Sequence, residues 1–221
     1  MTTALILRCD GRRDYIEETV RSTIAHLGAF PHQIIVDDSG DPEYARWLDA
    51  RFGGFNCVHH AERRGLSGGF KSACEVAIQL GVDYVFSTED DQAILSDIDL
   101  TAFIALLESQ PHLAQVAIKR TAYSPQEHAA GGIVEAYPQF YTERTGDGMT
   151  WIETDHLFVF SPSLIPRRVI ECALANTDTF LEDNVTAALW AHGYRSCYWG
   201  ATYDPPLCDH VGTQRSTGYR W

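Results

Sequence analysis

The sequence has few of the features that mark membrane, secreted or disulfide-rich proteins. None of its apolar runs approaches the roughly 18–20 residues that span a bilayer. The first apolar run, at residues 4–7, is followed by basic residues, which is the reverse of a secretory signal. The six cysteines are scattered without a C-x-x-C pair, a pattern typical of neither a zinc framework nor a disulfide scaffold. We therefore expect a soluble cytoplasmic protein with mostly buried free thiols.

Basic residues are also scarce. The chain has 17 Lys and Arg against 30 Asp and Glu, and its formal net charge is −13. Proteins that hold a duplex mainly through its phosphates need a basic face, and no run of Lys or Arg is present. The arginine pairs at 12–13, 63–64 and 167–168 are far apart in the chain. The charge disfavours sequence-independent nucleic-acid binding but permits arginines to converge on a small phosphorylated ligand.

What the sequence does contain is an alternation of strand-like and helix-like segments over 221 residues, 45% of them hydrophobic. Such alternation predicts one α/β domain with a mostly parallel sheet that helices flank on both faces. We find no repeat, linker or low-complexity segment. The expected strands lie at 4–8, 33–40 (ending in a turn), 56–60, 83–87, 114–120, 156–161 and 194–199, and the expected helices at 14–27, 41–52, 65–81, 100–109 and 182–193.

Residues 121–155 differ from the rest, because they are rich in Gly, Tyr, Pro, Thr and Glu and lack sustained periodicity. They predict long loops with a hairpin, and a loop of that length inside a compact domain is more often functional than idle. Tyr137, Phe140, Tyr141 and Trp151 would either stack on a ligand or pack the loops.

Acidic residues follow several predicted strands. Asp10 follows the first strand, Asp37 and Asp38 the second, and Glu89 to Asp91 the run at 83–87. Ligands of open α/β sheets bind outside the carboxyl ends of the strands, and hard divalent cations take carboxylate ligands. A divalent ion with a phosphorylated ligand would relieve the repulsion among these acids. Solvated acidic turns are the alternative interpretation.

Two later segments offer further polar groups. Glu182 and Asp183 begin a predicted helix, where acids usually complement the helix dipole, although a carboxylate facing a cleft is able to act as a general base. His210 is either an ordinary surface or core residue or a ligand, and imidazole suits Mn²⁺ better than Mg²⁺ or Ca²⁺.

The order of these segments resembles family 2 glycosyltransferases of the GT-A fold, especially their rhamnosyltransferase-like branch. The segment "RRGLSGGFKSACEVAIQLGVDYVFSTEDDQAIL" is similar to that family's Gly-rich turn, helix and strand before its D-x-D-type metal motif. The segment "FLEDNVTAALWAHGYRSCYW" resembles its catalytic "ED" helix and the strand after it, and "CDHVGTQRS" its C-terminal histidine–glycine–serine segment. "LILRCDGRRDYIEETVRSTIAHL" and "IIVDDSGD" match the usual opening.

The resemblance implies a single GT-A domain over 1–221, with a nucleotide-sugar-binding half at 1–120 and an acceptor and catalytic half at 121–221. It implies a metal-dependent inverting glycosyltransferase that uses Mn²⁺ or Mg²⁺ and a nucleoside diphosphate sugar, a UDP-sugar ahead of a GDP- or dTDP-sugar. Asp183 would be the catalytic base with Glu182 in support. Glu89, Asp91 and His210 would serve the metal, and the nucleotide-sugar contacts would come from Asp10, Asp37, Asp38, Arg64, Gly65, Gly68, Asp90 and Arg215.

Two departures from the family pattern bear on these roles. The chain reads "RCDGR" after the first strand, in place of the usual Pro-Thr-Tyr-Asn type turn, and the metal motif begins with Glu89 in place of aspartate. A sugar-phosphate nucleotidyltransferase and a non-catalytic nucleotide-sugar or carbohydrate-binding module are the alternatives. The acceptor would be a glycan, a protein or a modified DNA base. The short form resembles stand-alone bacterial or bacteriophage transferases, which implies the cytoplasm of a bacterial or phage-infected cell.

Overall fold

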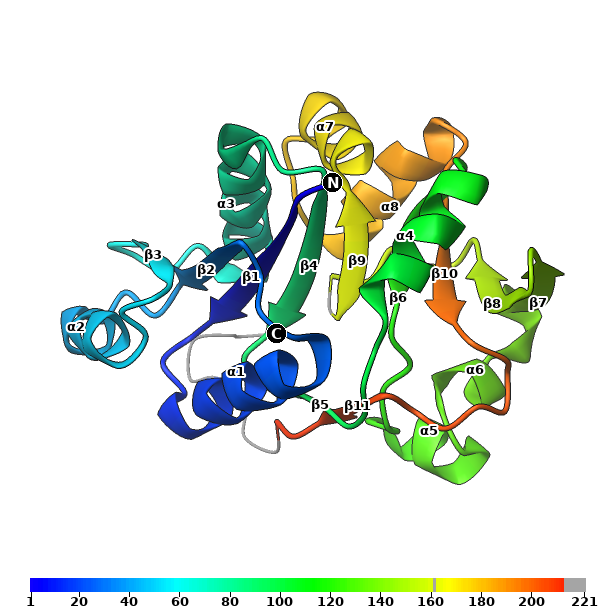
Figure 1. Ribbon diagram of the computed structural model, residues 1–221, viewed down its shortest axis with the longest axis horizontal. Helices are drawn as coiled ribbons and strands as arrows, with labels where there is room; N and C mark the ends of the chain where they lie inside the picture. Colours follow the sequence, from blue (N-terminus) through cyan, green and yellow to red (C-terminus); the bar gives the residue numbers. More distant parts are fainter. Residues whose placement is uncertain (161, 213–221) are drawn as a thin grey trace.

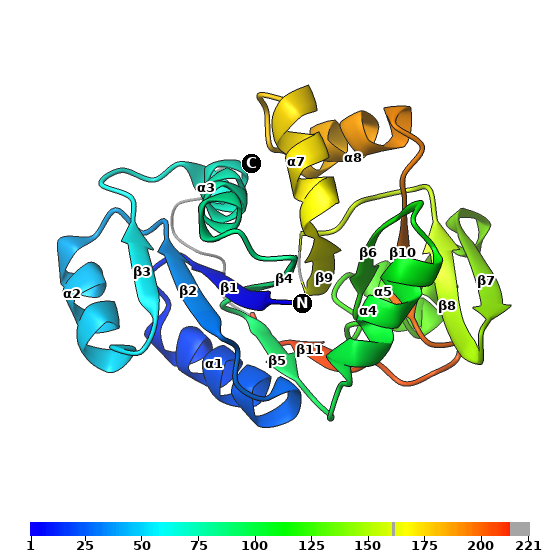
Figure 2. The same cartoon turned by 45° about the horizontal axis from the view of Figure 1, so that its top comes forward.

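A computed structural model describes residues 1–160 and 162–212, which form one large mixed sheet between two helical layers (Figures 1 and 2). The nine strands lie in the order β3-β2-β1-β4-β9-β6-β10-β8-β7, and β5 and β11 form a separate pair. The sheet is mostly parallel because, among the described strands, only β9 and β8 run against the others. The strands are β1 (Thr3–Cys9), β2 (His32–Asp37), β3 (Asn56–His59), β4 (Tyr84–Glu89), β5 (Gln92–Ile94), β6 (Leu113–Ala117), β7 (Tyr141–Gly146), β8 (Met149–Thr154), β9 (Ser163–Pro166), β10 (Arg195–Trp199) and β11 (Cys208–His210).

The alternation of side chains along β1 explains the two helical layers. Ala4 and Ile6 belong to one apolar cluster, with residues of α3, α7 and α8, whereas Leu5 and Leu7 pack with α1, α2 and α4 on the opposite face. None of the described helices combines the length and the apolar character needed to cross a bilayer. The helices are α1 (Arg13–Leu27), α2 (Pro42–Arg51), α3 (Gly65–Leu80), α4 (Leu100–Ser109), α5 (Pro125–Ala130), α6 (Ile133–Ala136), α7 (Arg167–Asn176) and α8 (Glu182–Ala191), with a 3₁₀ turn η1 (Pro138–Phe140).

The segment expected to be loops with a hairpin is more ordered than its composition indicated. It begins with α5, α6 and η1 and then forms the β7–β8 hairpin, which adds two strands to the sheet edge. Asp147 and Gly148 both have positive φ at the hairpin turn, as a two-residue primed turn requires. The hairpin was therefore predicted correctly, and the short helices were missed.

Residues 156–160 are not a strand, and that part of the prediction was wrong. Phe158 and Phe160 are buried, at 1% exposure each, but the backbone of 156–160 joins no ladder with any other described segment. The Phe158 amide instead donates to the Thr186 hydroxyl at 2.9 Å, and the Phe160 amide donates to the Glu182 carboxylate at 3.1 Å. Side chains of α8 thus replace strand pairing for this run, and the neighbouring β9 joins the sheet.

Candidate active site at the carboxyl edge of the sheet

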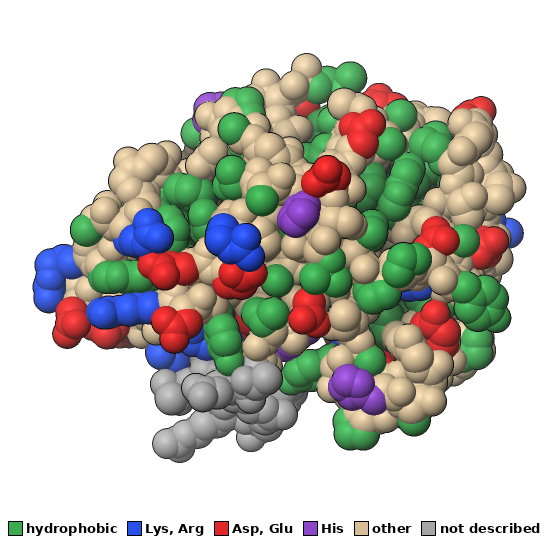
Figure 3. Space-filling model, turned by 60° about the horizontal axis from the view of Figure 1, so that its bottom comes forward, with side chains coloured by type: hydrophobic (Ala, Val, Ile, Leu, Met, Phe, Trp, Pro, Cys, Tyr) green, Lys and Arg blue, Asp and Glu red, His purple; other side chains and the backbone are tan. Residues whose placement is uncertain are grey.

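The acids that follow three different strands lie at one edge of the sheet, the lower edge in Figure 1. The Asp38 amide donates to the Cys9 carbonyl at 2.9 Å, and the Asp90 amide donates to the Arg8 carbonyl at the same distance. The Asp10 amide faces an Asp90 carboxylate oxygen at 3.4 Å. Figure 3 shows exposed acidic and basic side chains interleaved over the part of the molecule that holds α1 and α2, whereas the acids of this edge at 10, 37–38 and 90–91 are buried. The backbone contacts of the strand ends thus bring buried acids together.

Arg12 and Arg8 are cationic partners of the three acids at 89–91. The guanidinium of Arg12 lies 2.9 Å from a carboxylate oxygen of Asp91 and donates to both carboxylate oxygens of Asp90, one at 3.2 Å. Arg8, which is 5% exposed, lies 3.1 Å from the Glu89 carboxylate. We expected a divalent ion to relieve the repulsion among these acids. Arginine side chains already offset part of that repulsion.

Burial keeps this cluster electrostatically costly in spite of the arginines. It raises the pKa of Asp90 to about 7, although the charge of Arg12 acts in the opposite direction. Burial also raises the pKa of Glu89 above its ordinary value, against the charge of Arg8. The pKa of Asp10 rises to about 6 for the same reason, opposed by Arg63 at 2.8 Å. A further positive charge at this edge would stabilise all three carboxylates in their ionised form.

Glu182 is tied to the same cluster from the face of the sheet that α8 covers. Its carboxylate accepts a hydrogen bond from the Phe160 amide, and the Phe160 carbonyl accepts one from the Arg8 guanidinium at 2.8 Å. Phe160 therefore links α8 to Arg8, the arginine that pairs with Glu89. Burial raises the pKa of Glu182, and the nearby negative charge of Glu89 adds to the rise. Asp183 is exposed at the start of α8.

Asp91 and His210 form the part of the edge that suits a cation. The Asp91 carbonyl accepts the Val211 amide at 2.9 Å, and His210 Nε2 lies 3.8 Å from the Asp91 carboxylate. Asp91 Oδ1 and His210 Nδ1 are both buried and have no hydrogen-bond partner within residues 1–160 and 162–212. Unpaired buried acceptors are costly, and a carboxylate oxygen and an imidazole nitrogen are both donor types that Mn²⁺ takes.

Asp37 and Asp38, predicted to contact the nucleoside, are held by protein groups. Asp37 accepts from the Ser39 amide and lies 2.9 Å from His59 Nδ1. Asp38 lies 2.7 Å from His60 Nδ1 and also accepts the amides of Arg64 and Gly65, at 2.8 and 2.7 Å. The Asp38 carboxylate therefore caps α3, where the helix dipole favours an anion.

The glycines predicted to line the nucleotide pocket lie within α3. Gly65 begins the helix with a φ of +73°, and Gly68 follows in its first turn. A Cβ at Gly68 would lie 2.2 Å from Arg64 Cβ, so glycine at 68 leaves room for the Arg64 side chain. Arg215, the remaining predicted nucleotide contact, lies outside the described residues.

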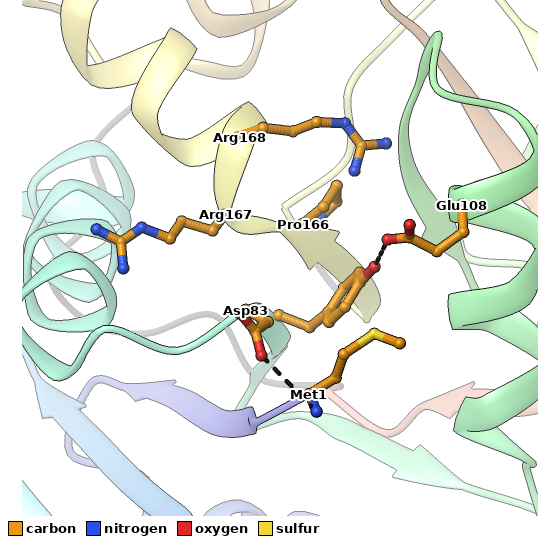
Figure 4. A pocket seen from close by; sticks show the side chains of 7 residues that line it. Met1, Asp83, Glu108, Pro166, Arg167 and Arg168 are labelled. Carbon is orange, nitrogen blue, oxygen red and sulfur yellow. Dashed lines mark hydrogen bonds and ion pairs between the residues drawn. The ribbon is translucent and has the colours of Figure 1, made fainter.

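The site contains three residues that sequence reasoning did not assign to it, namely Arg8, Arg12 and Arg63. A signal was present, because the pairs at 12–13 and 63–64 each place an arginine in the loop that follows a strand ending at this edge. A cavity of about 340 Å³ lies instead at the opposite edge, near the start of β4 (Figure 4). Its lining includes Tyr84, which donates to Glu108, and Arg168.

Comparisons with known proteins agree on the architecture. No protein-family model matches the sequence, and no curated protein matches it either. Solved structures do match. The mannosyltransferase PcManGT from Pyrobaculum calidifontis, solved with GDP-Man and Mn²⁺, has a TM-score of 0.62 at 17% identity over 96% of this chain and 57% of its own. S. aureus TarS 1-349, solved with UDP-GlcNAc, has a TM-score of 0.59 at 15% identity over 97% of this chain and 62% of its own.

A nucleotidyltransferase matches as well. A CMP:2-keto-3-deoxy-manno-octonic acid synthetase solved with CTP has a TM-score of 0.59 at 12% identity, over 98% of this chain and 94% of its own. The chain has a GT-A-like fold. It spans less than two thirds of the two glycosyltransferase chains it matches. The matched structures thus share their fold with this chain, and they include both glycosyltransferases and a nucleotidyltransferase.

Proposed function

We propose that the protein is an inverting glycosyltransferase that moves a sugar from a nucleoside diphosphate sugar to an acceptor hydroxyl. The observation that carries the proposal is that Asp91 and His210 lie side by side at the carboxyl edge of a GT-A-like sheet. Glu182 of α8 is linked to the same acid cluster through Phe160 and Arg8. These groups are far apart in the sequence, and a stability role explains neither the burial of the acids nor the unpaired atoms of Asp91 and His210.

Asp91 and His210 are the residues that would hold a divalent cation, with Glu89 beside them. Mn²⁺ or Mg²⁺ at this place would neutralise charge that builds on a leaving diphosphate. Arg12 lies against Asp91 and would add positive charge on the same side. Asp10, Asp37, Asp38, Asp90, Arg64, Gly65 and Gly68 belong to the half, 1–120, that we assign to the nucleotide sugar.

Asp183 is proposed as the general base. It is exposed at the first turn of α8 and so is reachable by an acceptor, whereas Glu182 is engaged by the Phe160 amide. The acceptor hydroxyl loses its proton to Asp183 as its oxygen bonds to the anomeric carbon. The bond from that carbon to the diphosphate breaks at the same time, and the nucleoside diphosphate leaves with the electron pair.

The test is to incubate the protein with Mn²⁺ and a panel of UDP-, GDP- and dTDP-sugars, with glycan, protein and modified-base acceptors. We expect free nucleoside diphosphate to appear with a sugar–acceptor product, and the UDP-sugars to be used first. Tight donor binding without turnover across a broad acceptor panel would instead support a binding module.

A sugar-phosphate nucleotidyltransferase is the second candidate. It is favoured by one observation, the match to the synthetase over 94% of that chain, where the two glycosyltransferase matches cover 57% and 62%. The same assay design separates the two, because a nucleoside triphosphate with a sugar acid or sugar phosphate would then give pyrophosphate.

A further inference from the structure

A second cluster of metal-ligating side chains lies between the edge strand β3 and α2, where it adjoins Asp37 and includes neither Asp91 nor His210. Cys57 and His59 are two residues apart on β3, and alternation along a strand therefore places them on the same face. Asp49 comes from α2, which packs beside β3 (Figure 1). The thiol sulfur, one imidazole nitrogen and one carboxylate oxygen of these residues all lie within 4.8 Å of one another.

We propose that Asp49, Cys57 and His59 form a binding site for a zinc ion. Sulfur, imidazole nitrogen and carboxylate oxygen are the donor atoms that Zn²⁺ takes in proteins, whereas Mg²⁺ and Ca²⁺ take oxygen ligands. His59 Nε2 and Asp49 Oδ1 are 3.1 Å apart, a separation that suits two neighbouring ligands of one tetrahedral ion. The thiolate and the carboxylate would balance the charge of the ion, and water would take the fourth position.

The imidazole is oriented as metal-bound histidines usually are. His59 Nδ1 lies 2.9 Å from the carboxylate of Asp37, which is 1% exposed, so this buried acid fixes the ring and directs Nε2 toward Asp49 and Cys57. A histidine that ligates through Nε2 carries its proton on Nδ1 and donates it to such a carboxylate. Zinc binding would thus release the Cys57 proton and any proton on His59 Nε2 to the solvent.

The site is accessible from solvent. Asp49 and His59 are exposed and Cys57 is half-buried, so an ion has a path from solvent and substitutions here remove little core packing. An ion at this point would join α2 to the edge strand and, through His59, to Asp37 at the end of β2. The competing arrangement is a protonated His59 that bridges Asp37 and Asp49 without any metal.

Titration with Co²⁺ and Zn²⁺, on protein stripped with a chelator and kept reduced by a phosphine, separates the two arrangements. We expect one equivalent of Co²⁺ to produce a thiolate-to-cobalt absorption band, which Zn²⁺ then abolishes. Cys57→Ser should remove the band and lower the Zn²⁺ affinity at least ~100-fold, and His59→Gln should also lower it strongly. Cys172→Ser is the matched control, because Cys172 is another half-buried thiol, located on α7.

A further variant keeps this site apart from the carboxyl edge. Asp91→Asn removes the proposed edge ligand and should leave the thiolate band unchanged, so failure of the glycosyltransferase proposal has no bearing on this result. Absence of the band in the unsubstituted protein, or equal Zn²⁺ affinity in Cys57→Ser and the unsubstituted protein, would overturn the zinc site in favour of the bridging His59.

Discussion

The guanidinium of Arg12 lies 2.9 Å from the carboxylate of Asp91 and also bonds the adjacent Asp90. Arg12, the residue before α1, therefore places its positive charge against the acid cluster. Asp91 Oδ1 is left without a hydrogen-bond partner within the described residues. The cluster thus combines a permanent positive charge with a vacant acceptor, and this combination leads to the first prediction.

Arg12→Ala should destabilise the protein and make its stability depend more strongly on divalent ions. Removing one partner of a largely buried ion pair leaves the acids to repel each other, and we expect a loss of about 2–3 kcal/mol in the free energy of unfolding. Excess Mn²⁺ should raise the melting temperature of the variant more than that of the unsubstituted protein. The control is Arg13→Ala, whose partner Glu43 is exposed, and which should cost below ~1 kcal/mol. Equal losses in both variants would contradict the role of Arg12.

The free energy of unfolding should depend on pH because burial raises the pKa of the Asp90 carboxyl. Because burial raises its pKa from 3.8 in the unfolded chain to about 7, the folded state holds this proton at pH values where the unfolded state has lost it. Its contribution to stability is therefore full below about pH 4 and is lost as the pH rises to about 7. As the pH rises from about 4 to about 7, the free energy of unfolding of Asp90→Asn should increase by about 2–4 kcal/mol relative to that of the unsubstituted protein.

Urea unfolding of both proteins at intervals of one pH unit measures this difference. Asp178→Asn, at an exposed position, is measured in parallel as the control for replacing an aspartate by asparagine. A difference for Asp90→Asn that stays flat with pH would mean that Arg12 keeps the carboxyl ionised throughout.

Much of this arrangement was predictable from the sequence, and the reasons differ from element to element. The strands β1, β2 and β4 were found because apolar runs end in acids, and the carboxyl ends of parallel strands must meet. The run 156–160 was mispredicted because the sequence of an apolar segment does not show what its amides bond to. The Phe158 amide bonds to a side chain, where a strand would bond to a neighbouring strand. β5 and β11 are only three residues long, and periodicity cannot identify so short an element.

The sequence also indicated which acids meet, but not how they are neutralised. That Arg12 reaches Asp90 and Asp91 depends on how α1 leaves β1, which no local pattern encodes. Likewise the scattered cysteines gave no sign of the cluster at Cys57, because its third member, Asp49, comes from another element.

Thr186→Val should show what holds the irregular run in place. The Thr186 hydroxyl accepts the Phe158 amide at 2.9 Å and donates to the Glu182 carbonyl, and valine keeps the shape but leaves a buried amide unpaired. We expect a loss of about 1–3 kcal/mol in the free energy of unfolding. Thr142→Val, on an exposed face of β7, should be nearly neutral in the same urea titration. A neutral Thr186→Val would mean that another group satisfies the amide.

Gly212→Ala should perturb the cation position directly. A Cβ at this position would lie 2.5 Å from Asp91 Oδ2 and 3.0 Å from Asp91 Cγ, so the carboxylate would have to turn away. We expect Mn²⁺ to bind about 10–100-fold more weakly by calorimetry, as when a ligand's supporting partner is removed. Gly54→Ala is the control, because a Cβ there meets nothing within 4 Å. Unchanged Mn²⁺ affinity would place the ion away from Asp91.

The two acids at the start of α8 should differ in what they do for turnover. Asp183→Asn should lower the rate of sugar transfer about 10²–10⁴-fold with donor binding intact, because an amide takes no proton from the acceptor hydroxyl. Glu182→Gln should lower it far less, since the amide oxygen of glutamine still accepts the Phe160 amide and keeps that residue bonded to Arg8. Rates from product formation and donor affinities from calorimetry are needed for both variants. The reverse order would assign the base to Glu182, whose pKa burial already raises toward the range in which a carboxylate accepts protons well.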